Sequence, residues 1–502
     1  MSTTPNAELY TELRDRQRAI EARIVEYRAK IADSERELKE CLKMLQQLPP
    51  RGYPVLTLPN EIMSEIFVYS SVPSILGRAS TPNPRYAPML LLHVCSAWRA
   101  IALATPALWT DLWLNFHWRD LSARFFEAEN LDKFFADYLV RLGACPLSLT
   151  IQGSVQSVDE GRRIIAAVFD LLSPRLEVLD LMTDMNYYRD HRPLFPLLRE
   201  LTVGFPLHEY DDLIGLPGRP IQTFSAAAQL RKLYLTMKAT PSHFAIPWET
   251  LTAFDGSEVS SRECVQVLRS APSLVECSIH AEMNEHVDLA PLSHQNLKSF
   301  KLRSGGEALF PSVTFPALED MNIFAEDMSD EHLLQFISRS SSTLLRFSAE
   351  NVSMQSLKDM TLLTHLQLLA PKGRYLITFL NMLDRTMTPG FLPQLQTLEF
   401  EDCRPFVHPA LVEVLSSRAV SQDGAAKLRS YRQIWSIFPF EELQVRYEGS
   451  VALALKKLVE GGMEIYIGPP KWYDIRASNM HVALTLLQVA NTCVGGSKLS
   501  PI

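Results

Sequence analysis

The sequence offers no segment suited to spanning a membrane or directing secretion. Among its 502 residues, no apolar run reaches the roughly 18 residues that a transmembrane helix requires. The best candidate begins at Met89, but His93, Trp98 and Arg99 soon interrupt it. The first residues are polar where a signal peptide would need an apolar core. We therefore expect a protein that neither crosses nor binds a membrane.

Cysteine is sparse and scattered. The seven cysteines, none of which forms a C-x-x-C pair, are Cys41, Cys95, Cys145, Cys264, Cys277, Cys403 and Cys493. This spacing argues against a disulfide framework and against a zinc site, so we expect no metal. Free or buried thiols are typical of a reducing compartment, which predicts a cytoplasmic or nuclear protein.

Dense positive charge and catalytic motifs are also missing. The formal net charge is −8, and no cluster of lysine and arginine forms the basic patch that nucleic-acid binding usually requires. The sequence contains no Walker loop, G-x-G-x-x-G, H-E-x-x-H or G-x-S-x-G motif. We therefore expect no nucleic-acid partner, no cofactor and no enzymatic activity.

The composition that remains is that of a soluble globular protein. Apolar residues make up 47% of the chain and charged residues 21%. The length suggests several folding units. The pattern divides the chain into a long helix over 8–48, a linker over 49–57, a tryptophan-bearing segment over 58–115, a repeat region over 145–450 and a cap and tail over 451–502.

Residues 8–48 contain neither proline nor glycine and follow a heptad pattern. Positions a are Tyr10, Gln17, Ile24, Ile31, Leu38 and Leu45, and positions d are Leu13, Ile20, Tyr27, Ser34, Cys41 and Leu48. Only Gln17 and Ser34 interrupt the apolar seam, which is the pattern of a coiled coil. Self-association through 8–48 is one interpretation. The other is an amphipathic helix that folds back on the body of the protein.

The segment 58–115 begins with a predicted helix in LPNEIMSEIFVYS. Pro59 lies in its first turn, where the missing amide donor costs nothing. Leu58, Ile62 and Ile66 recur at helical spacing, with Met63 and Phe67 beside them, and predict one apolar face. A loop rich in proline and serine follows over 71–88.

A second predicted helix has the sequence MLLLHVCSAWRAIALA. The residues expected on its apolar face are Leu91, Val94, Cys95, Trp98 and Ile101. Thr105 and Pro106 are suited to end this helix and to begin the next, because threonine is a good N-cap and proline a good first residue. Trp109 and Trp113 follow, so the segment predicts three short helices around buried tryptophans.

In order, L-P-x-E-I-x-x-x-I-F, V-C-x-x-W-R-x-I-A and P-x-L-W resemble the F-box. The matching residues are Leu58, Pro59, Glu61, Ile62, Ile66, Phe67, Val94, Cys95, Trp98, Arg99, Ile101 and Trp109. The long preceding helix and the loop 71–88 are similar to those of the large fungal F-box-like families. That loop is longer than a compact F-box needs.

The resemblance implies that this segment docks on a Skp-type adaptor, which links it to a cullin–RING ubiquitin ligase. The implied adaptor-binding residues are Leu58, Pro59, Glu61, Ile62 and Ile66. The implied core residues are Phe67, Val94, Cys95, Trp98, Ile101 and Trp109. For Leu58 and Pro59 the alternative is an ordinary helix start without a docking role.

A spaced pattern, apolar-x-x-apolar-x-apolar, recurs nine times between 145 and 450, and a degenerate tenth copy, Leu251-Phe254-Gly256, fills one gap. The copies begin at Leu176, Leu198, Leu230, Leu251, Leu274, Leu297, Leu318, Leu344, Leu363 and Leu395, which are 19 to 32 residues apart. A period in the twenties with this core is the signature of leucine-rich repeats. One repeat cannot bury its own apolar face, so the repeats must stack.

Predicted return helices precede three of the copies. CVQVLRSAP lies before Leu274, DEHLLQFISRS before Leu344 and RYLITFLNMLDR before Leu395. The predicted fold is therefore mixed α and α/β: a long N-terminal helix, a three-helix F-box, and an irregular leucine-rich-repeat solenoid of parallel strands with return helices. The alternative is a generic α/β domain with incidental leucine spacing. A further helix is expected near 479–491.

Between the second and third apolar residues of each copy stands one residue that should point away from the core. The candidates for binding a target protein are Asp180, Thr202, Tyr234, Lys301, Asn322, Gln367 and Glu399. We expect a substrate receptor that joins an adaptor to a target protein. The alternative is a non-catalytic scaffold that dimerises through its coiled coil and has no role in ubiquitin ligation.

Overall fold

The computed structural model describes residues 5–47, 58–71, 81–116, 128–155, 157–205, 219–281, 289–324, 329–350, 352–371, 373–402, 409–421, 424–434 and 449–468. The linker 49–57, residues 72–80 of the loop 71–88 and the helix expected near 479–491 lie outside these residues. The chain divides into two units, Met1–Ile66 and Phe67–Ile502, with the boundary inside one helix. In the described ranges, no helix combines the length and apolar character needed to cross a bilayer.

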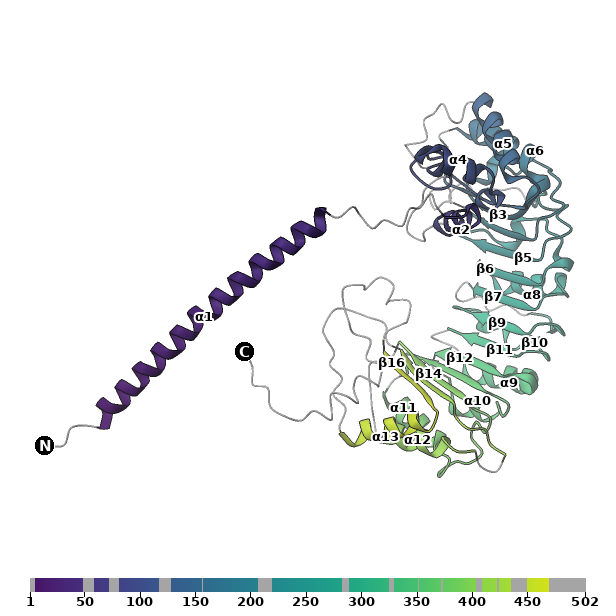
Figure 1. Cartoon of the computed structure of the whole chain (residues 1–502). Coiled ribbons are helices and arrows are strands. Elements are labelled where there is room, and N and C mark those ends of the chain that lie inside the picture. The colour runs from purple at the N-terminus through teal and green to yellow at the C-terminus, as the bar shows by residue number, and fades with distance from the viewer. Residues whose placement is uncertain are drawn as a thin grey trace. The chain divides into compact units, whose positions relative to one another are not determined.

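The first unit contains the long helix α1 (Pro5–Gln47), shown in purple in Figure 1. It confirms the helix expected over 8–48 as far as Gln47, and Leu48 lies outside the described residues. This stretch lacks residues that break a helix. Ion pairs one turn apart add small stabilising contributions along its surface. These pairs are Arg18–Asp15 at 3.5 Å, Lys30–Glu26 at 2.6 Å and Arg36–Asp33 at 3.0 Å. Every side chain from Glu12 to Glu40 is exposed.

Short helices follow in the tryptophan-bearing segment. They are α2 (Asn60–Ser70), α3 (Leu91–Val94), α4 (Ser96–Leu103) and the 3₁₀ helix η2 (Pro106–Trp109). Thr105 takes the N-cap position of η2 and Pro106 its first residue, as predicted. The Thr105 hydroxyl does not cap η2, however, but donates to the carbonyl oxygen of Ile101 at 2.7 Å.

The prediction of one continuous second helix was wrong, because the helix breaks at Cys95. Cys95 is extended, with φ −158° and ψ 170°, and its sulfur caps α4 by accepting from the Trp98 amide at 3.4 Å. Because α3 and α4 are separate helices, the residues of α3 do not continue the apolar face of α4. Val94 is consequently 51% exposed, so its assignment to the apolar core was also wrong.

The second unit is built on one sheet of fourteen strands, all parallel to their neighbours and following one another in chain order. They are β1 (Asp111–Asn115), β2 (Leu147–Gln152), β3 (Leu176–Met182), β4 (Glu200–Gly204), β5 (Lys232–Thr236), β6 (Ala253–Val259), β7 (Glu276–Ala281), β9 (Ser299–Leu302), β11 (Asp320–Ile323), β12 (Arg346–Glu350), β13 (His365–Leu369), β14 (Thr397–Glu401), β15 (Ser430–Ile434) and β16 (Glu464–Gly468). Figure 1 shows them stacked in succession. The arrangement is that of an α/β solenoid-like fold.

Helices and short segments connect successive strands. The helices are α5 (Ala128–Leu142), α6 (Val158–Leu172), α8 (Ser261–Ser270), α9 (Asp330–Ser340), α10 (Met354–Lys358), α11 (Gly373–Leu383), α12 (Pro409–Arg418) and α13 (Gly449–Glu460). The return helices α8, α9 and α11 were predicted from the sequence and are confirmed. A separate two-stranded sheet pairs β8 (Leu292–Ser293) with β10 (Val313–Thr314).

Strand register explains the recurring apolar pattern. The middle apolar residue of each copy pairs with its counterpart on the next strand, as Leu179 does with Leu201 and Leu201 with Leu233. The third residues pair in the same way, beginning with Leu181 and Val203. All ten copies lie at strands of the sheet. The ladders they form are fully buried, which is why the pattern recurs at every strand.

The sheet is longer than the predicted range 145–450. At its start, Trp109, Leu112 and Leu114 form an additional copy of the pattern, and β1 pairs with β2 from Asp111 to Asn115. At its end, β16 pairs with β15. The sequence did not predict the first copy because it begins with tryptophan and not with leucine. Its strand also follows directly from the tryptophan-bearing segment, which was predicted to be a separate domain.

Candidate interaction surfaces

The helix α2 separates its apolar residues onto two faces. Met63 and Phe67 are buried, at 2% and 1% exposure, whereas Ile62 and Ile66 are 49% and 46% exposed. Leu58 is half-buried and Pro59 exposed just before the helix. The sequence predicted a single apolar face. The structure shows that Met63 and Phe67 belong to the core while Ile62 and Ile66 do not.

We call Leu58, Pro59, Ile62 and Ile66 the α2 stripe. The backbone holds its start in place, since the Met63 amide donates to the Pro59 carbonyl oxygen at 3.0 Å. Glu61 lies exposed in the first turn, where the helix dipole favours an acid. Two exposed isoleucines one turn apart give a ridge that could bury apolar area against another protein.

The helices that follow pack through aromatic rings. The rings of Phe67 and Trp98 lie 4.9 Å apart at a tilt of 56°. Phe67 is buried, while Cys95, Trp98 and Ile101 are half-buried. Of the predicted core residues, Val94 alone is exposed.

Trp109 joins these helices to the sheet. Its side chain is fully buried, and its indole nitrogen donates to the Ala102 carbonyl oxygen of α4 at 3.0 Å. The Tyr138 ring of α5 meets it edge-on at 5.6 Å, and the Arg141 guanidinium lies 4.8 Å from its centroid. Trp109 therefore serves both as a core residue of the short helices and as the first residue of the copy of the apolar pattern that leads into β1.

The second surface is a row of side chains across the face of the sheet opposite the apolar ladders. We call it the middle row. Strand register places one residue from each of the fourteen strands in it: Trp113, Thr150, Asp180, Thr202, Tyr234, Asp255, Ser278, Lys301, Asn322, Ser348, Gln367, Glu399, Arg432 and Tyr466. Most of these side chains are half-buried between their neighbours on adjacent strands.

All seven residues predicted to face a target lie in the middle row. Sequence reasoning missed the other seven. Asp255, Ser278 and Ser348 occupy the same position in copies that were recognised, so the pattern itself could have identified them. The remaining four lie on strands whose copies were not recognised, because tryptophan, proline, glutamine or glycine replaces an apolar residue of the pattern.

A chain of hydrogen bonds runs along the C-terminal part of the middle row. The Ser348 hydroxyl donates to Gln367 at 2.8 Å, and the Gln367 amide donates to Glu399 at 3.3 Å. Arg432 then donates to Glu399 at 2.9 Å. Burial raises the pKa of Glu399, while the charge of Arg432 acts to lower it. Side-chain hydrogen bonds therefore link this part of the row across four adjacent strands.

The earlier part of the row contains polar atoms that the protein does not satisfy. Among the described residues, no hydrogen-bond partner is found for Asp180 Oδ1, Ser278 Oγ or Asn322 Oδ1. Burial raises the pKa of Asp180 from 3.8 to about 6. A buried polar atom without a partner costs about 1–3 kcal/mol. A bound molecule that offered hydrogen-bond donors here would recover part of that cost.

A neighbouring row, two residues earlier on each strand, carries cross-strand ion pairs. Lys232 meets Glu200 at 3.3 Å, and Arg346 meets Asp320 at 3.2 Å. Each pair is directly opposite in register. The face of the sheet is therefore polar across more than one row, in contrast to the α2 stripe.

The thiols of Cys264 and Cys277 are not activated for chemistry. Cys264 and Cys277 are buried, and burial raises the pKa of both. Across the ranges that the structure describes, no group of three or more histidine, cysteine or acidic side chains is placed to hold a metal ion. The surfaces that the geometry does assemble are suited to contacts with another macromolecule.

Comparison with known proteins adds little to this geometry. No protein-family model matches the chain, and no curated protein matches it. A chain in the crystal structure of the Rad7 and Elc1 complex in yeast is similar at 14% sequence identity and a TM-score of 0.29, covering 78% of this chain and 94% of that one. At this TM-score the likeness carries no inference about function.

Proposed function

We propose that this protein is a substrate-recognition receptor of a cullin–RING, SCF-type ubiquitin ligase. In this proposal α2 and the short helices after it act as an F-box that docks on a Skp-type adaptor. The sheet acts as a leucine-rich-repeat surface that binds a target protein. The chain contributes no catalytic group; it raises the effective concentration of the target's lysines near the ubiquitin-loaded partner.

The observation that carries the proposal is the exposure of the α2 stripe. Ile62 and Ile66, which match docking positions of the F-box, are half exposed, while Met63 and Phe67 on the same helix are buried. A helix without a docking role does not require isoleucine at two exposed positions. This supports a docking role for the α2 stripe over an ordinary helix start.

The repeat assignment rests on two independent features. The spacing of the apolar pattern falls in the range of leucine-rich repeats. The strands that carry it are parallel and follow chain order. Such a sheet presents one side chain per strand in the middle row, so its chemistry can be specified strand by strand. Different polar residues at successive strands favour recognition of one particular target.

The test is binding of a purified Skp-type adaptor to the full chain, measured by calorimetry. The wild type should bind, and Ile62→Asp/Ile66→Asp should bind at least about 100-fold more weakly, because burying each isoleucine contributes roughly 1.5–3 kcal/mol. The matched control is Leu194→Asp/Met387→Asp, which replaces two apolar side chains that are 72% and 75% exposed on the second unit. That control should bind like the wild type.

If the folded wild type fails to bind the adaptor at micromolar concentration, the receptor proposal is wrong. Equal binding by the Ile62→Asp/Ile66→Asp variant would also contradict it. The exposed face of α1 favours the second candidate in that case, a non-catalytic scaffold that assembles through its helix and binds a partner through its sheet.

A further inference from the structure

The helix α1 exposes an apolar seam along its length. The seam consists of Leu13, Ile20, Ile24, Tyr27, Ile31 and Leu38, with the polar residues Gln17 and Ser34 at two further heptad positions. The six apolar side chains are between 43% and 60% exposed. Helices in proteins gain most of their stability by packing an amphipathic face. A helix of 43 residues with this seam would therefore be stabilised by packing against another helix of similar length and apolar pattern.

We propose that α1 pairs with α1 of a second copy of this chain as an antiparallel two-stranded coiled coil. In this arrangement Ile24 faces Tyr27 of the second copy, Ile20 faces Ile31, and Leu13 faces Leu38. Each layer then contains one residue from position a and one from position d, which is the packing that an antiparallel seam requires. The partner is a second copy because the same helix supplies a complementary residue at every described layer.

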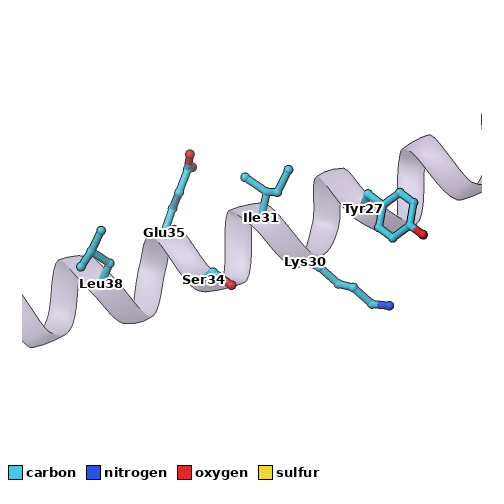
Figure 2. Close-up of a pocket in the computed structure, with 6 residues that line it drawn as sticks. All are labelled: Tyr27, Lys30, Ile31, Ser34, Glu35 and Leu38. Atoms are coloured by element: carbon cyan, nitrogen blue, oxygen red, sulfur yellow. The ribbon is translucent and has the colours of Figure 1, made fainter. Parts of the chain in front are cut away.

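The polar members of the seam favour the antiparallel direction. Figure 2 shows the seam around Ser34, where a shallow hollow is lined by Tyr27, Lys30, Ile31, Ser34, Glu35 and Leu38. In a coiled coil, a side chain from the facing helix enters a hole formed by four residues. Serine is the smallest residue of the seam, so the hole at this point has room for a longer side chain.

Gln17 is the side chain that the antiparallel arrangement places opposite this hollow. Its length fills the space beside Ser34, and its amide can hydrogen-bond to the serine hydroxyl. A parallel arrangement would instead place Ser34 opposite Ser34 and Gln17 opposite Gln17. The serine layer would then be underfilled, which is destabilising in a packed seam.

Charges beside the seam favour the same direction. In an antiparallel coil, e positions face e positions and g positions face g positions. Three kinds of flanking pair are then of opposite charge: Arg14–Glu35, Arg16–Glu37 and Glu21–Arg28. One kind, Arg23–Lys30, is of like charge. Each kind occurs twice because of the two-fold symmetry.

A parallel coil would have fewer favourable charge pairs beside the seam. It would bring together two kinds of opposite pair, Arg16–Glu21 and Lys30–Glu35, and one like pair, Arg23–Arg28. It would also leave Arg14 and Glu37 without a charged neighbour on the facing helix. Flanking charges of this kind set partner choice and orientation in coiled coils.

An antiparallel coil has a consequence for the rest of the protein. A helix of this length extends about 65 Å, and the two chains leave the coil at opposite ends. The assembly would carry two α2 stripes and two middle rows. This inference does not depend on the proposed function, since a receptor and a scaffold would both become bivalent.

The first test is the mass of the full chain in solution, measured by analytical ultracentrifugation. The wild type should be a dimer, and Ile24→Asp/Ile31→Asp should dissociate at least about 100-fold more readily, because it buries four carboxylates in the seam of each dimer. The matched control is Val25→Asp/Ala32→Asp, one residue further along at both sites, where Val25 is 65% exposed and lies off the seam. The control should remain a dimer.

The second test is orientation, measured by disulfide cross-linking of full-length chains in a Cys41→Ser background. A mixture of Ile20→Cys and Ile31→Cys chains should form a mixed disulfide, whereas neither variant alone should cross-link to itself. Self-cross-linking of the single variants, without the mixed product, would show a parallel coil and overturn the inference. A wild type that is monomeric at tens of micromolar would overturn it as well, and so would a control that dissociates like the seam variant.

Discussion

The α2 stripe and the middle row of the sheet differ in chemistry and in burial. The stripe presents Ile62 and Ile66 from one short helix, and both are about half exposed. The middle row presents one side chain from each of the fourteen strands, most of them polar and half-buried and several hydrogen-bonded to their neighbours. Binding free energy at the α2 stripe would come from burying apolar area. At the middle row it would come from hydrogen bonds to particular polar atoms.

In the proposed receptor, this difference would let one chain combine a shared adaptor with an individual target. Apolar area contributes to binding without strict geometry, so a two-isoleucine ridge would suit such an adaptor. A polar row rejects partners that leave its atoms unpaired, so it suits a single target. Changes in the stripe should therefore alter adaptor binding alone, and changes in the row should alter stability or target binding alone.

The largest effect is expected at Trp109, which packs against the short helices directly before the first strand of the sheet. Replacing it by alanine should lower the free energy of unfolding by about 3–5 kcal/mol, because a fully buried indole and its hydrogen bond to Ala102 are lost. Urea denaturation of the full chain measures this. The half-buried Trp98→Ala should cost less; an equal or larger loss for Trp98 would show that Trp109 is not the joint between helices and sheet.

A second prediction concerns Asp180 in the middle row. Burial raises the pKa of its carboxyl from 3.8 to about 6, so its ionised form is disfavoured in the folded state. Below about pH 4 the group is protonated whether the chain is folded or not, and it imposes no penalty. As the pH rises from about 4 to about 6, the unfolded chain ionises this carboxyl while the folded protein keeps it protonated, so stability falls, and above about pH 6 the loss is complete.

The neutral variant Asp180→Asn should therefore be more stable than the wild type by about 1–2 kcal/mol at pH 8, with the difference vanishing near pH 4. Thermal unfolding of both proteins across this pH range is the measurement. Thr202→Val, on the next strand of the same row, serves as a non-titrating control. A variant that is less stable than wild type at pH 8 would mean that Asp180 is stabilised by its surroundings.

A third prediction concerns the Glu399–Arg432 pair at the other end of the row. Glu399→Gln, Arg432→Met and the double variant form a cycle whose coupling energy should be about 1 kcal/mol, since the pair is partly buried and hydrogen-bonded at 2.9 Å. The exposed cross-strand pair Arg346–Asp320 should couple by no more than about 0.5 kcal/mol. Chemical denaturation gives both values; equal coupling would remove the distinction between the two rows.

The smallest effect is expected for adaptor binding by these row variants. Glu399→Gln and Arg432→Met should bind a Skp-type adaptor within about twofold of the wild type, a difference of less than about 0.5 kcal/mol. Calorimetry with the same adaptor checks this. A tenfold loss would mean that the row and the stripe do not act separately.

Much of the fold could be predicted because it repeats. Leu179, Leu201 and Leu233 stand at the same point of successive copies, and the sheet pairs them directly. Repetition lets weak signals reinforce one another, and it also identified the row to which Asp180 and Glu399 belong. The two ends of the sheet were missed because Trp109 and Gly462 stand where the other copies have leucine, and a pattern based on residue type does not recognise them.

The short helices could be predicted less well because their geometry depends on single residues. Leu91, Val94 and Cys95 fit an uninterrupted helical face, yet the extended backbone at Cys95 ends one helix and begins another. Helical periodicity also could not separate Ile62 from Met63, which lie on adjacent sides of the same helix. Their burial depends on packing with residues that are distant in the sequence.

The docking role of the α2 stripe is tested most directly by hydrogen–deuterium exchange of the full chain with and without a Skp-type adaptor. The adaptor should slow exchange at the backbone amides of 58–70 and leave exchange in the strands that carry the middle row unchanged. Protection of those strands, or no protection anywhere under conditions where the adaptor is in excess, would contradict the assignment of the α2 stripe as the docking surface.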